Sequence, residues 1–515
     1  MRRLRSSAWG LGLVLILALG GCTGQSDPAP PSGSPTAPVS VTPPEPADPL
    51  PLGQLAVFSG VASLNAGSNC TGTLIDTGVP AGPAYVLTNG HCAGDVGRSP
   101  QTTTLSEGWA GTAEFLAAEG NPDDRLIVEV LGLEYSTMRH TDTAILRLEP
   151  TLGELEGLGI RPVPITATEP TPGASVVNVG VPVQDLANED WVLRRGECTL
   201  GAQHTLIEGP WMWFGVWSND CPGIIQGSSG SPLLTIGADG APQEVVAMIN
   251  TTTAGATAAN GGACSINLPC EVTDDSVRMV EQTNYAQSVA GVGACFAASG
   301  DFTLGDGCPL PVSDVWTESG GGSFRGGDAP DSAGRTPEVS LVGRTPGTVR
   351  TTLVPLGDGT ACQQEQTYQS TTPVALPKAG EAWDLVGVIV PVDLPEQEGH
   401  YALCAVRAAD YLGAATVLFD VDRTPPLFPA SAEVQDLGAG DMLVQPHLNP
   451  PDTSTVRFTW GDPATVDCQD TEAFQGFFIV PLTIPREDLP AVYCIYSLDA
   501  AGNASAVTRL DIPAP

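Results

Sequence analysis

Short apolar runs separated by glycine, asparagine and proline turns dominate the chain between residues 52 and 310. Four of these runs have the length and composition of strands, at residues 84–87, 126–130, 144–146 and 245–249. No long stretch repeats its apolar positions with the 3.6-residue period of a helix. The pattern therefore predicts an all-β domain, a barrel or a sandwich rather than an α/β fold, over residues 52–310.

A weak internal repeat follows a Gly-rich polar segment at residues 311–335, which we interpret as a linker. Thr-Val-Arg at residues 348–350 recurs at 455–457, and each copy precedes a cysteine. A second cysteine ends an apolar run in each unit, at Cys404 and Cys494. The repeat predicts two small β-sandwich modules, at residues 336–424 and 425–515. They loosely resemble the Ig-like or fibronectin-like modules of bacterial surface proteins.

The first 22 residues have the pattern of a targeting signal. Three arginines among the first five residues precede a short apolar run at residues 11–19. The Leu-Gly-Gly-Cys sequence that ends at Cys22 resembles a bacterial lipobox, which implies a diacylated cysteine and a lipid anchor. The alternative is an ordinary signal peptide cut nearby, with Cys22 incidental. Residues 23–51 are rich in Pro, Ser and Thr and predict an extended tether.

Composition narrows the function classes. The 58 acidic residues outnumber 21 basic ones, for a net charge of −37, and Lys378 is the one lysine. A nucleic-acid binder needs clustered basic side chains, so we exclude that class. The 60 glycines and 47 prolines also argue against a helix bundle.

Because we expect the chain to be exported to an oxidising compartment, we expect its cysteines to form disulfides. Thirteen cysteines less Cys22 leave an even set of twelve, enough for six disulfides. Consecutive pairing is one connectivity among many, and the spacings lack the tight pairs of structural zinc sites, so we expect no metal. The twelve are Cys70, Cys92, Cys198, Cys221, Cys264, Cys270, Cys295, Cys308, Cys362, Cys404, Cys468 and Cys494.

Three segments carry groups that suit nucleophilic catalysis. They are Thr-Asn-Gly-His-Cys at residues 88–92, Thr-Asp-Thr-Ala-Ile-Leu at 141–146, and Gly-Ser-Ser-Gly-Ser-Pro at 227–232. A serine hydroxyl needs an imidazole base, and the imidazole needs a carboxylate that holds its tautomer. Glycines beside the serine leave room for backbone N–H groups to face an oxyanion.

In this order the segments resemble the chymotrypsin/trypsin-like serine endopeptidases, in particular the bacterial secreted branch. The resemblance implies a double β-barrel, with His91 as general base, Asp142 as its orienting carboxylate and Ser229 as nucleophile. The N–H groups of Gly227 and Ser229 would form the oxyanion hole. It also implies a Cys70–Cys92 disulfide at the histidine loop and a Cys198–Cys221 disulfide near the nucleophile loop.

Each role has competitors in the sequence. Asp123 and Asp124 compete with Asp142 but lie in a solvated Asn-Pro-Asp-Asp turn. Ser228 and Ser231 compete with Ser229. His140, two residues before Asp142, is expected to be exposed. A Ser–Lys dyad would need Lys378, which lies outside this region.

Two departures from trypsin bear on activation. The chain lacks an Ile-Val-Gly-Gly start, and Ser228 stands where zymogen-type relatives carry an aspartate. We therefore expect no activation by cleavage that frees a new N-terminus to pair with that aspartate.

By resemblance, the primary pocket would be walled by Asn250, Thr251 and Thr252 with its base near Gly223. The absence of an acid there favours a neutral or small substrate side chain. The loop between Cys264 and Cys270 would narrow access.

The sequence thus predicts a lipid-anchored, extracytoplasmic serine endopeptidase of the bacterial cell envelope, in the outer membrane or at the cell surface. It would act on proteins or peptides and need no cofactor; the oligomeric state stays open. The alternatives are a non-catalytic binding or adhesion lipoprotein with an inactive protease-like domain, and an envelope-stress sensor that clips one partner protein.

Overall fold

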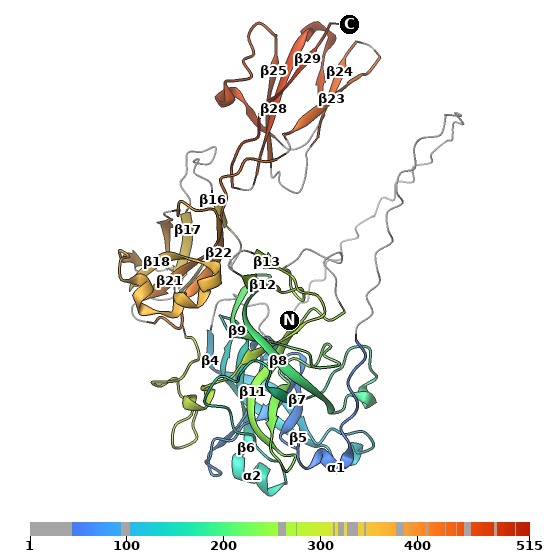
Figure 1. Cartoon of the computed structure of the whole chain (residues 1–515), viewed down its shortest axis with the longest axis vertical. Coiled ribbons are helices and arrows are strands. Elements are labelled where there is room, and N and C mark those ends of the chain that lie inside the picture. Colours follow the sequence, from blue (N-terminus) through green and yellow to red (C-terminus); the bar gives the residue numbers. More distant parts are fainter. Residues whose placement is uncertain are drawn as a thin grey trace, which may run out of the picture. The chain divides into compact units, whose positions relative to one another are not determined.

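A computed structural model describes most of the chain from residue 44 to residue 514 (Figure 1). The expected targeting signal, Cys22 and most of the tether lie outside the described residues. Among the described residues, no helix has the length and apolar character needed to cross a bilayer. The described ranges are 44–93, 103–255, 264–273, 276–312, 315–317, 324–326, 338–343, 347–376, 386–392, 394–407, 410–427, 429–438, 440–447, 455–477, 481–499 and 501–514.

Six strands form a closed barrel in the order β1-β2-β3-β6-β5-β4. Its core contains Leu64, Val86, Phe115 and Leu146, each almost fully buried. The predicted runs at 84–87, 126–130 and 144–146 all fall within strands of this barrel. The six strands are β1 (Val61–Asn65), β2 (Asn69–Leu74), β3 (Pro83–Thr88), β4 (Thr103–Phe115), β5 (Leu126–Thr137) and β6 (Thr143–Thr151).

A second sheet of eight strands has the order β13-β12-β8-β7-β10-β11-β14-β9. An additional β8–β9 pairing joins its far strand back to β8, so six of its strands make a closed ring. The predicted run at 245–249 lies in β11. The strands are β7 (Ser175–Gly180), β8 (Arg194–Glu208), β9 (Trp211–Asn219), β10 (Pro232–Ile236), β11 (Pro242–Thr252), β12 (Cys270–Thr273), β13 (Ser276–Arg278) and β14 (Asn284–Ser288).

The two barrels are joined by a shared apolar cluster and by backbone contacts. Val61 and Ile145 of the first barrel belong to the same buried cluster as Val177 and Leu234 of the second. The Thr71 N–H donates to the carbonyl of Ser229 at 2.8 Å, which links β2 to the predicted nucleophile loop. The predicted double β-barrel is confirmed, and the contact between its halves positions the candidate site.

Helices are short. They are α1 (Leu52–Leu55), α2 (Leu152–Gly157) and the 3₁₀ helices η1 (Gly90–Ala93), η2 (Pro122–Asp124), η3 (Asn188–Asp190), η5 (Val292–Cys295), η6 (Leu356–Gln363), η7 (Glu365–Tyr368), η8 (Thr471–Ala473) and η9 (Arg486–Asp488). A capping box begins α2: the Thr151 hydroxyl accepts from the Glu154 N–H, and the Glu154 carboxylate accepts from the Thr151 N–H.

The C-terminal half contains two further units with two sheets each, as expected of β-sandwiches. The first unit comprises β15 (Val315–Thr317), β16 (Phe324–Gly326), β17 (Glu338–Gly343), β18 (Gly347–Pro355), β19 (Val374–Leu376), β20 (Val386–Pro391), β21 (Gly399–Arg407) and β22 (Ala415–Val421). The second comprises β23 (Ser431–Asp436), β24 (Met442–His447), β25 (Thr455–Gly461), β26 (Gln475–Phe477), β27 (Leu482–Ile484), β28 (Ala491–Leu498) and β29 (Thr508–Ile512).

Two strands of the first unit arise from the segment that we interpreted as a linker. β15 pairs with β17, and β16 pairs with β22. Residues 311–335 are Gly-rich and polar overall, but β15 is Val-Trp-Thr and β16 begins with Phe324, which are residue types that favour strands. The surrounding glycines hide these two short runs in the sequence, and backbone pairing to strands later in the chain completes them.

All six disulfides join consecutive cysteines, which confirms that connectivity. The pairs are Cys70–Cys92, Cys198–Cys221, Cys264–Cys270, Cys295–Cys308, Cys362–Cys404 and Cys468–Cys494.

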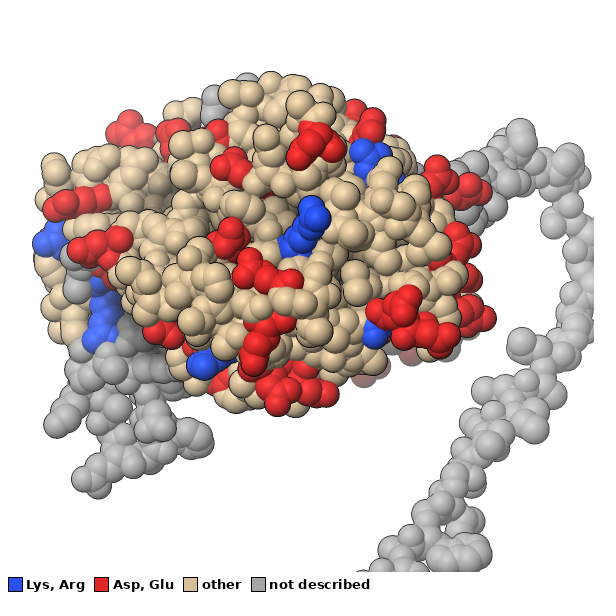
Figure 2. Space-filling model, turned by 90° about the horizontal axis from the view of Figure 1, so that it is seen from below, with Lys and Arg blue, Asp and Glu red and all other residues tan. Residues whose placement is uncertain are grey.

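Acidic side chains are scattered over the face shown in Figure 2, with few basic ones between them. Self-repulsion of this kind favours solubility rather than a local metal store.

Candidate active site

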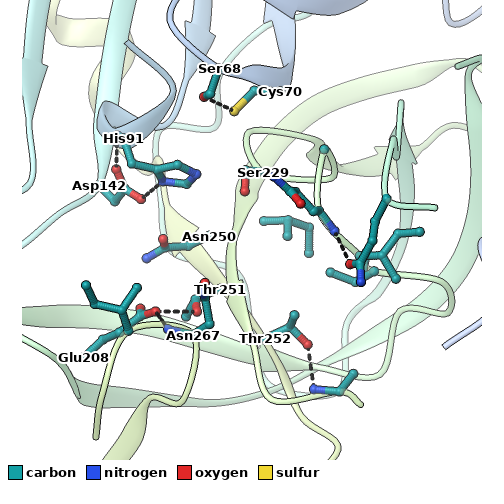
Figure 3. Close-up of a pocket in the computed structure, with 18 of the residues that line it drawn as sticks. Ser68, Cys70, His91, Asp142, Glu208, Ser229, Asn250, Thr251, Thr252 and Asn267 are labelled. Atoms are coloured by element: carbon teal, nitrogen blue, oxygen red, sulfur yellow. Dashed lines mark hydrogen bonds and ion pairs between the residues drawn. The ribbon is translucent and has the colours of Figure 1, made fainter. Parts of the chain in front are cut away.

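A pocket of about 580 Å³ brings together the three residues expected to act in catalysis. His91, Asp142 and Ser229 all line it (Figure 3). His91 and Asp142 belong to the first barrel, whereas Ser229 lies in the loop before β10 of the second. The pocket is therefore built from both barrels, and neither barrel alone contains it.

His91 is held by Asp142 through two hydrogen bonds. Nδ1 of His91 lies 2.6 Å from Oδ2 of Asp142, and the His91 backbone N–H donates to Oδ1 at 2.9 Å. The Asn89 amide donates to the Asp142 carbonyl at 2.9 Å and secures the loop. A side chain at Gly90 would clash with the Thr137 carbonyl, so this turn of η1 needs glycine.

The pKa of His91 lies above its usual value of 6.5 because two carboxylates act on it. Burial is the largest influence and lowers the pKa, since it disfavours the charged imidazolium. The charge and hydrogen bond of Asp142 and the charge of Glu208 raise it, and together they outweigh burial. Asp142 thus both orients the imidazole and stabilises its protonated form.

The three candidate serines have different environments. Ser231 is fully buried; its hydroxyl donates to the Ser228 carbonyl at 2.6 Å and accepts from the Asn178 amide. Ser228 is also buried, and its hydroxyl accepts from the Ile225 N–H. Among the described residues, the Ser229 hydroxyl has no hydrogen-bond partner, and of the three serines Ser229 alone lines the pocket. This arrangement leaves Ser229 as the available hydroxyl.

The loop around Ser229 presents backbone donors. Gly227 and Gly230 have φ values of 98° and 78°, which favour glycine, and a Cβ on Gly230 would clash with the Thr71 carbonyl. Within the described part of the chain, neither the Gly227 N–H nor the Ser229 N–H has a hydrogen-bond partner. The Gly227 carbonyl is turned away, because it accepts from the Thr71 hydroxyl at 3.0 Å. Two free N–H groups in one loop suit an oxyanion.

The other candidates lie outside the pocket. Asp123 and Asp124 are exposed in η2. His140 is 4% exposed, contrary to the expectation that it would be exposed. Its Nε2 lies 2.9 Å from the Thr416 hydroxyl, and burial together with the charge of Arg139 lowers its pKa to about 3. Sequence proximity to Asp142 did not reveal this contact because Thr416 is 276 residues away.

Of the four residues expected at the primary pocket, three line the pocket described here and one does not. Asn250, Thr251 and Thr252 at the end of β11 line the pocket. Gly223 is not among the lining residues, and a Cβ on it would clash with the backbone of Ala47. The segment before α1 therefore packs behind the expected base.

Several lining residues were missed by sequence reasoning. They are Glu208, Trp211 and Trp213 from β8 and β9, and Ile266 and Asn267 from the loop between Cys264 and Cys270. The last two agree with the expectation that this loop narrows access. The sequence signal for the two tryptophans is the unusual Trp-Met-Trp-Phe run at residues 211–214, which follows Glu208 closely.

A metal role for the site has little support in its chemistry. Ligand atoms of Cys70, His91 and Cys92 lie within 4.8 Å of one another. The two sulfurs form a disulfide and are not thiolates, which are the form of cysteine that binds metal ions. This cluster therefore braces the histidine loop.

Comparisons with known proteins found a matching family model and several similar solved structures. Residues 70–248 match a family model described as a trypsin-like peptidase domain. No curated protein sequence matches the chain. Similar solved structures include a thermostable serine protease, AL20, from an extremophilic microorganism, with 14% identity, a TM-score of 0.30, and 46% of this chain and 94% of that chain covered.

Two others are a scabies mite inactivated protease paralogue and human heparin binding protein, both 15% identical over 48% of this chain. Their TM-scores are 0.33 and 0.31, and 96% and 93% of those chains are covered. The family model covers both the histidine segment and the nucleophile segment. Residues 70–248 of this chain therefore carry a trypsin-like peptidase domain.

Proposed function

We propose that the chain is a serine endopeptidase that hydrolyses peptide bonds through an acyl-enzyme, with His91, Asp142 and Ser229 as its catalytic residues. The observation that carries this proposal is the pocket in which a carboxylate-bound imidazole and an unpartnered serine hydroxyl meet. The match to a trypsin-like peptidase domain supports the same reaction class.

Proton transfer begins at His91. Its Nδ1–H donates to Oδ2 of Asp142, which leaves the Nε2 lone pair free to accept the Ser229 proton. Ser229 Oγ then attacks the substrate carbonyl, and the protonated imidazole is stabilised by Asp142. General-base assistance of this kind typically accelerates a reaction by about 10²–10⁴-fold.

The negative charge that develops on the substrate oxygen needs fixed donors. The N–H groups of Gly227 and Ser229 supply them, and each such donor is worth about 10²–10³ in kcat. The C–N bond breaks as His91 returns its proton to the leaving amine, and an ester to Ser229 Oγ remains. Water, deprotonated by His91, then hydrolyses the ester and regenerates the free serine.

We further propose that the chain acts outside the cytoplasm, anchored through a lipid on Cys22. The six disulfides support an oxidising compartment. The absence of an acidic side chain at Gly223 and at residues 250–252 supports a primary pocket that takes a neutral or small side chain. The two C-terminal units would act as spacers or binding modules.

A competing proposal is a binding lipoprotein without catalytic activity. The observation in its favour is that no hydrogen bond joins Ser229 to His91 among the described contacts. Such bonds are often long in enzymes without substrate and tighten only in the complex, so the geometry also fits an enzyme.

The test is labelling of the purified chain with a tagged fluorophosphonate, which reacts with activated serines. We expect labelling that is lost in Ser229→Ala and in His91→Ala. Ser299→Ala, an exposed serine of the same domain, is the matched control and should label normally. An unlabelled wild-type chain, with folding verified by circular dichroism, would contradict the peptidase proposal and favour the binding lipoprotein.

A further inference from the structure

The pocket contains a second acid, Glu208, that the catalytic steps do not use. Glu208 ends β8, is 5% exposed and lines the pocket (Figure 3). Trp211 and Trp213 line the same pocket. Its Oε1 accepts from the Thr251 hydroxyl at 3.0 Å and from the Asn267 N–H at 2.8 Å. Its Oε2 accepts from the Trp213 indole N–H at 3.2 Å.

All three donors to Glu208 are neutral. Within the described residues, no Lys or Arg forms an ion pair with this carboxylate. Burial raises the pKa of Glu208, whereas its hydrogen bonds and the charge of His91 lower it. Burying a charged carboxylate without a cation beside it is energetically unfavourable. A positively charged group on a ligand would offset this cost.

Unpartnered donors in the same pocket point independently to a peptide ligand. The Trp211 indole N–H and the Asn250 amide nitrogen have no hydrogen-bond partner in the described structure. Both residues are 6% exposed and line the pocket. Buried donors are nearly always paired in a completed structure, and peptide carbonyls are suitable acceptors. A bound peptide would thus satisfy the donors with its backbone and the carboxylate with a side chain.

The position of Glu208 separates it from the nucleophile loop. Neighbouring side chains of a strand point to opposite faces, and in β11 the Thr251 hydroxyl contacts Glu208 whereas the Thr252 hydroxyl contacts Asn284. In Figure 3, Glu208 lies beside Thr251 and Asn267, and Ser229 lies apart from this group. A substrate side chain that reaches Glu208 is therefore not the one held beside the nucleophile loop.

The walls around Glu208 suit a long side chain with a charged end. Trp211, Met138 and Ile266 line this pocket, and Trp211 stacks on Trp213 with ring centres 5.8 Å apart. Lysine and arginine bury an aliphatic stem on apolar walls, and their cations interact well with indole faces. The net charge of −37 also favours the approach of cationic peptides.

We propose that Glu208 is a specificity-determining residue that selects peptides with a Lys or Arg side chain at a position other than the one directly before the scissile bond. This inference rests on the proposed peptidase function and adds a substrate class to it. The preference is independent of the neutral or small side chain expected in the primary pocket.

The test uses pairs of internally quenched peptides that differ by Lys or Gln at one position on either side of the scissile bond. For the wild-type chain we expect kcat/KM to favour Lys by about ten- to a hundredfold at one position, the range of a charge-assisted hydrogen bond. In Glu208→Gln this ratio should fall to about one. The wild-type preference should also shrink as salt is raised, which a purely structural role would not produce.

Glu271→Gln is the matched control. Glu271 is another buried acid of the same sheet, bonded to the Tyr285 hydroxyl and absent from the pocket lining. This variant should keep the wild-type Lys preference. A wild-type chain without any Lys preference, or a Glu208→Gln variant that retains it, would overturn the proposal.

A binding measurement separates this proposal from the catalytic one. In Ser229→Ala, fluorescence anisotropy should show tighter binding of Lys than of Gln peptides, and adding Glu208→Gln should remove the difference. This binding experiment tests the role of Glu208 even if the chain has no peptidase activity. Equal binding of both peptides to Ser229→Ala would contradict the proposal.

Discussion

Two histidine–aspartate pairs in this chain have the same distance between Nδ1 and the carboxylate oxygen but different surroundings. Nδ1 of His91 lies 2.6 Å from Asp142, and Nδ1 of His400 lies 2.6 Å from Asp420 in the first C-terminal unit. The side chains of His91 and Asp142 are 25% and 1% exposed, against 46% and 14% for His400 and Asp420. The short contact alone therefore does not identify an active site.

The difference lies in what surrounds each imidazole. His91 lines a pocket with an unpartnered serine hydroxyl and with Glu208, whereas His400 pairs with Asp420 across β21 and β22 and has a side chain that is about half exposed. Charges interact more strongly where water is excluded, so the Asp142 carboxylate has a larger effect on its partner. Burial and a nearby nucleophile, rather than the pair itself, make the first site a candidate for catalysis.

The largest expected difference between the pairs is in turnover. Asp142→Asn should reduce kcat by about 10⁴-fold. The oxygen of the substituted amide would keep the bond from the His91 backbone N–H, which places the amide nitrogen against Nδ1. The imidazole would then carry its proton on Nε2 and be unable to accept one from Ser229. Asp420→Asn is the control and should leave kcat unchanged, so a similar loss in both would refute the assignment.

A smaller effect is expected in the pH dependence. A general base must be neutral, so kcat/KM should rise with pH through the pKa of His91. Because Asp142 and Glu208 raise that pKa, the midpoint should lie above 6.5. Glu208→Gln removes one negative charge and should move the midpoint to lower pH, while Glu271→Gln should not. A midpoint at or below 6.5 in the wild-type chain would contradict this electrostatic picture.

The smallest effect is expected from the more exposed pair, His400 and Asp420. Exposed ion pairs contribute about 0–1 kcal/mol to stability, because water and salt screen them. His400→Ala should therefore change the free energy of unfolding by no more than about 1 kcal/mol. Urea unfolding followed by circular dichroism measures it. A change of several kcal/mol would show that this pair has a structural role that its exposure does not suggest.

Residue preferences along the chain were enough to predict the all-β class and the local elements of the peptidase domain. The apolar runs at 84–87, 126–130, 144–146 and 245–249 lie in β3, β5, β6 and β11. The even cysteine set and its order also agree with the six disulfides. These features depend on the strand preference of each residue and on pairing between neighbouring cysteines in the sequence. Both can be recognised from the sequence alone.

Which groups meet in space depended on packing between distant segments. The fold placed His91 against Asp142 across 51 residues, buried Ser228 and Ser231 while leaving the Ser229 hydroxyl unpartnered, and buried His140 against Thr416. It also brought Glu208 into the pocket and made strands of residues 315–317 and 324–326. Periodicity along the chain could not reveal these contacts, because it reports only which way neighbouring side chains point.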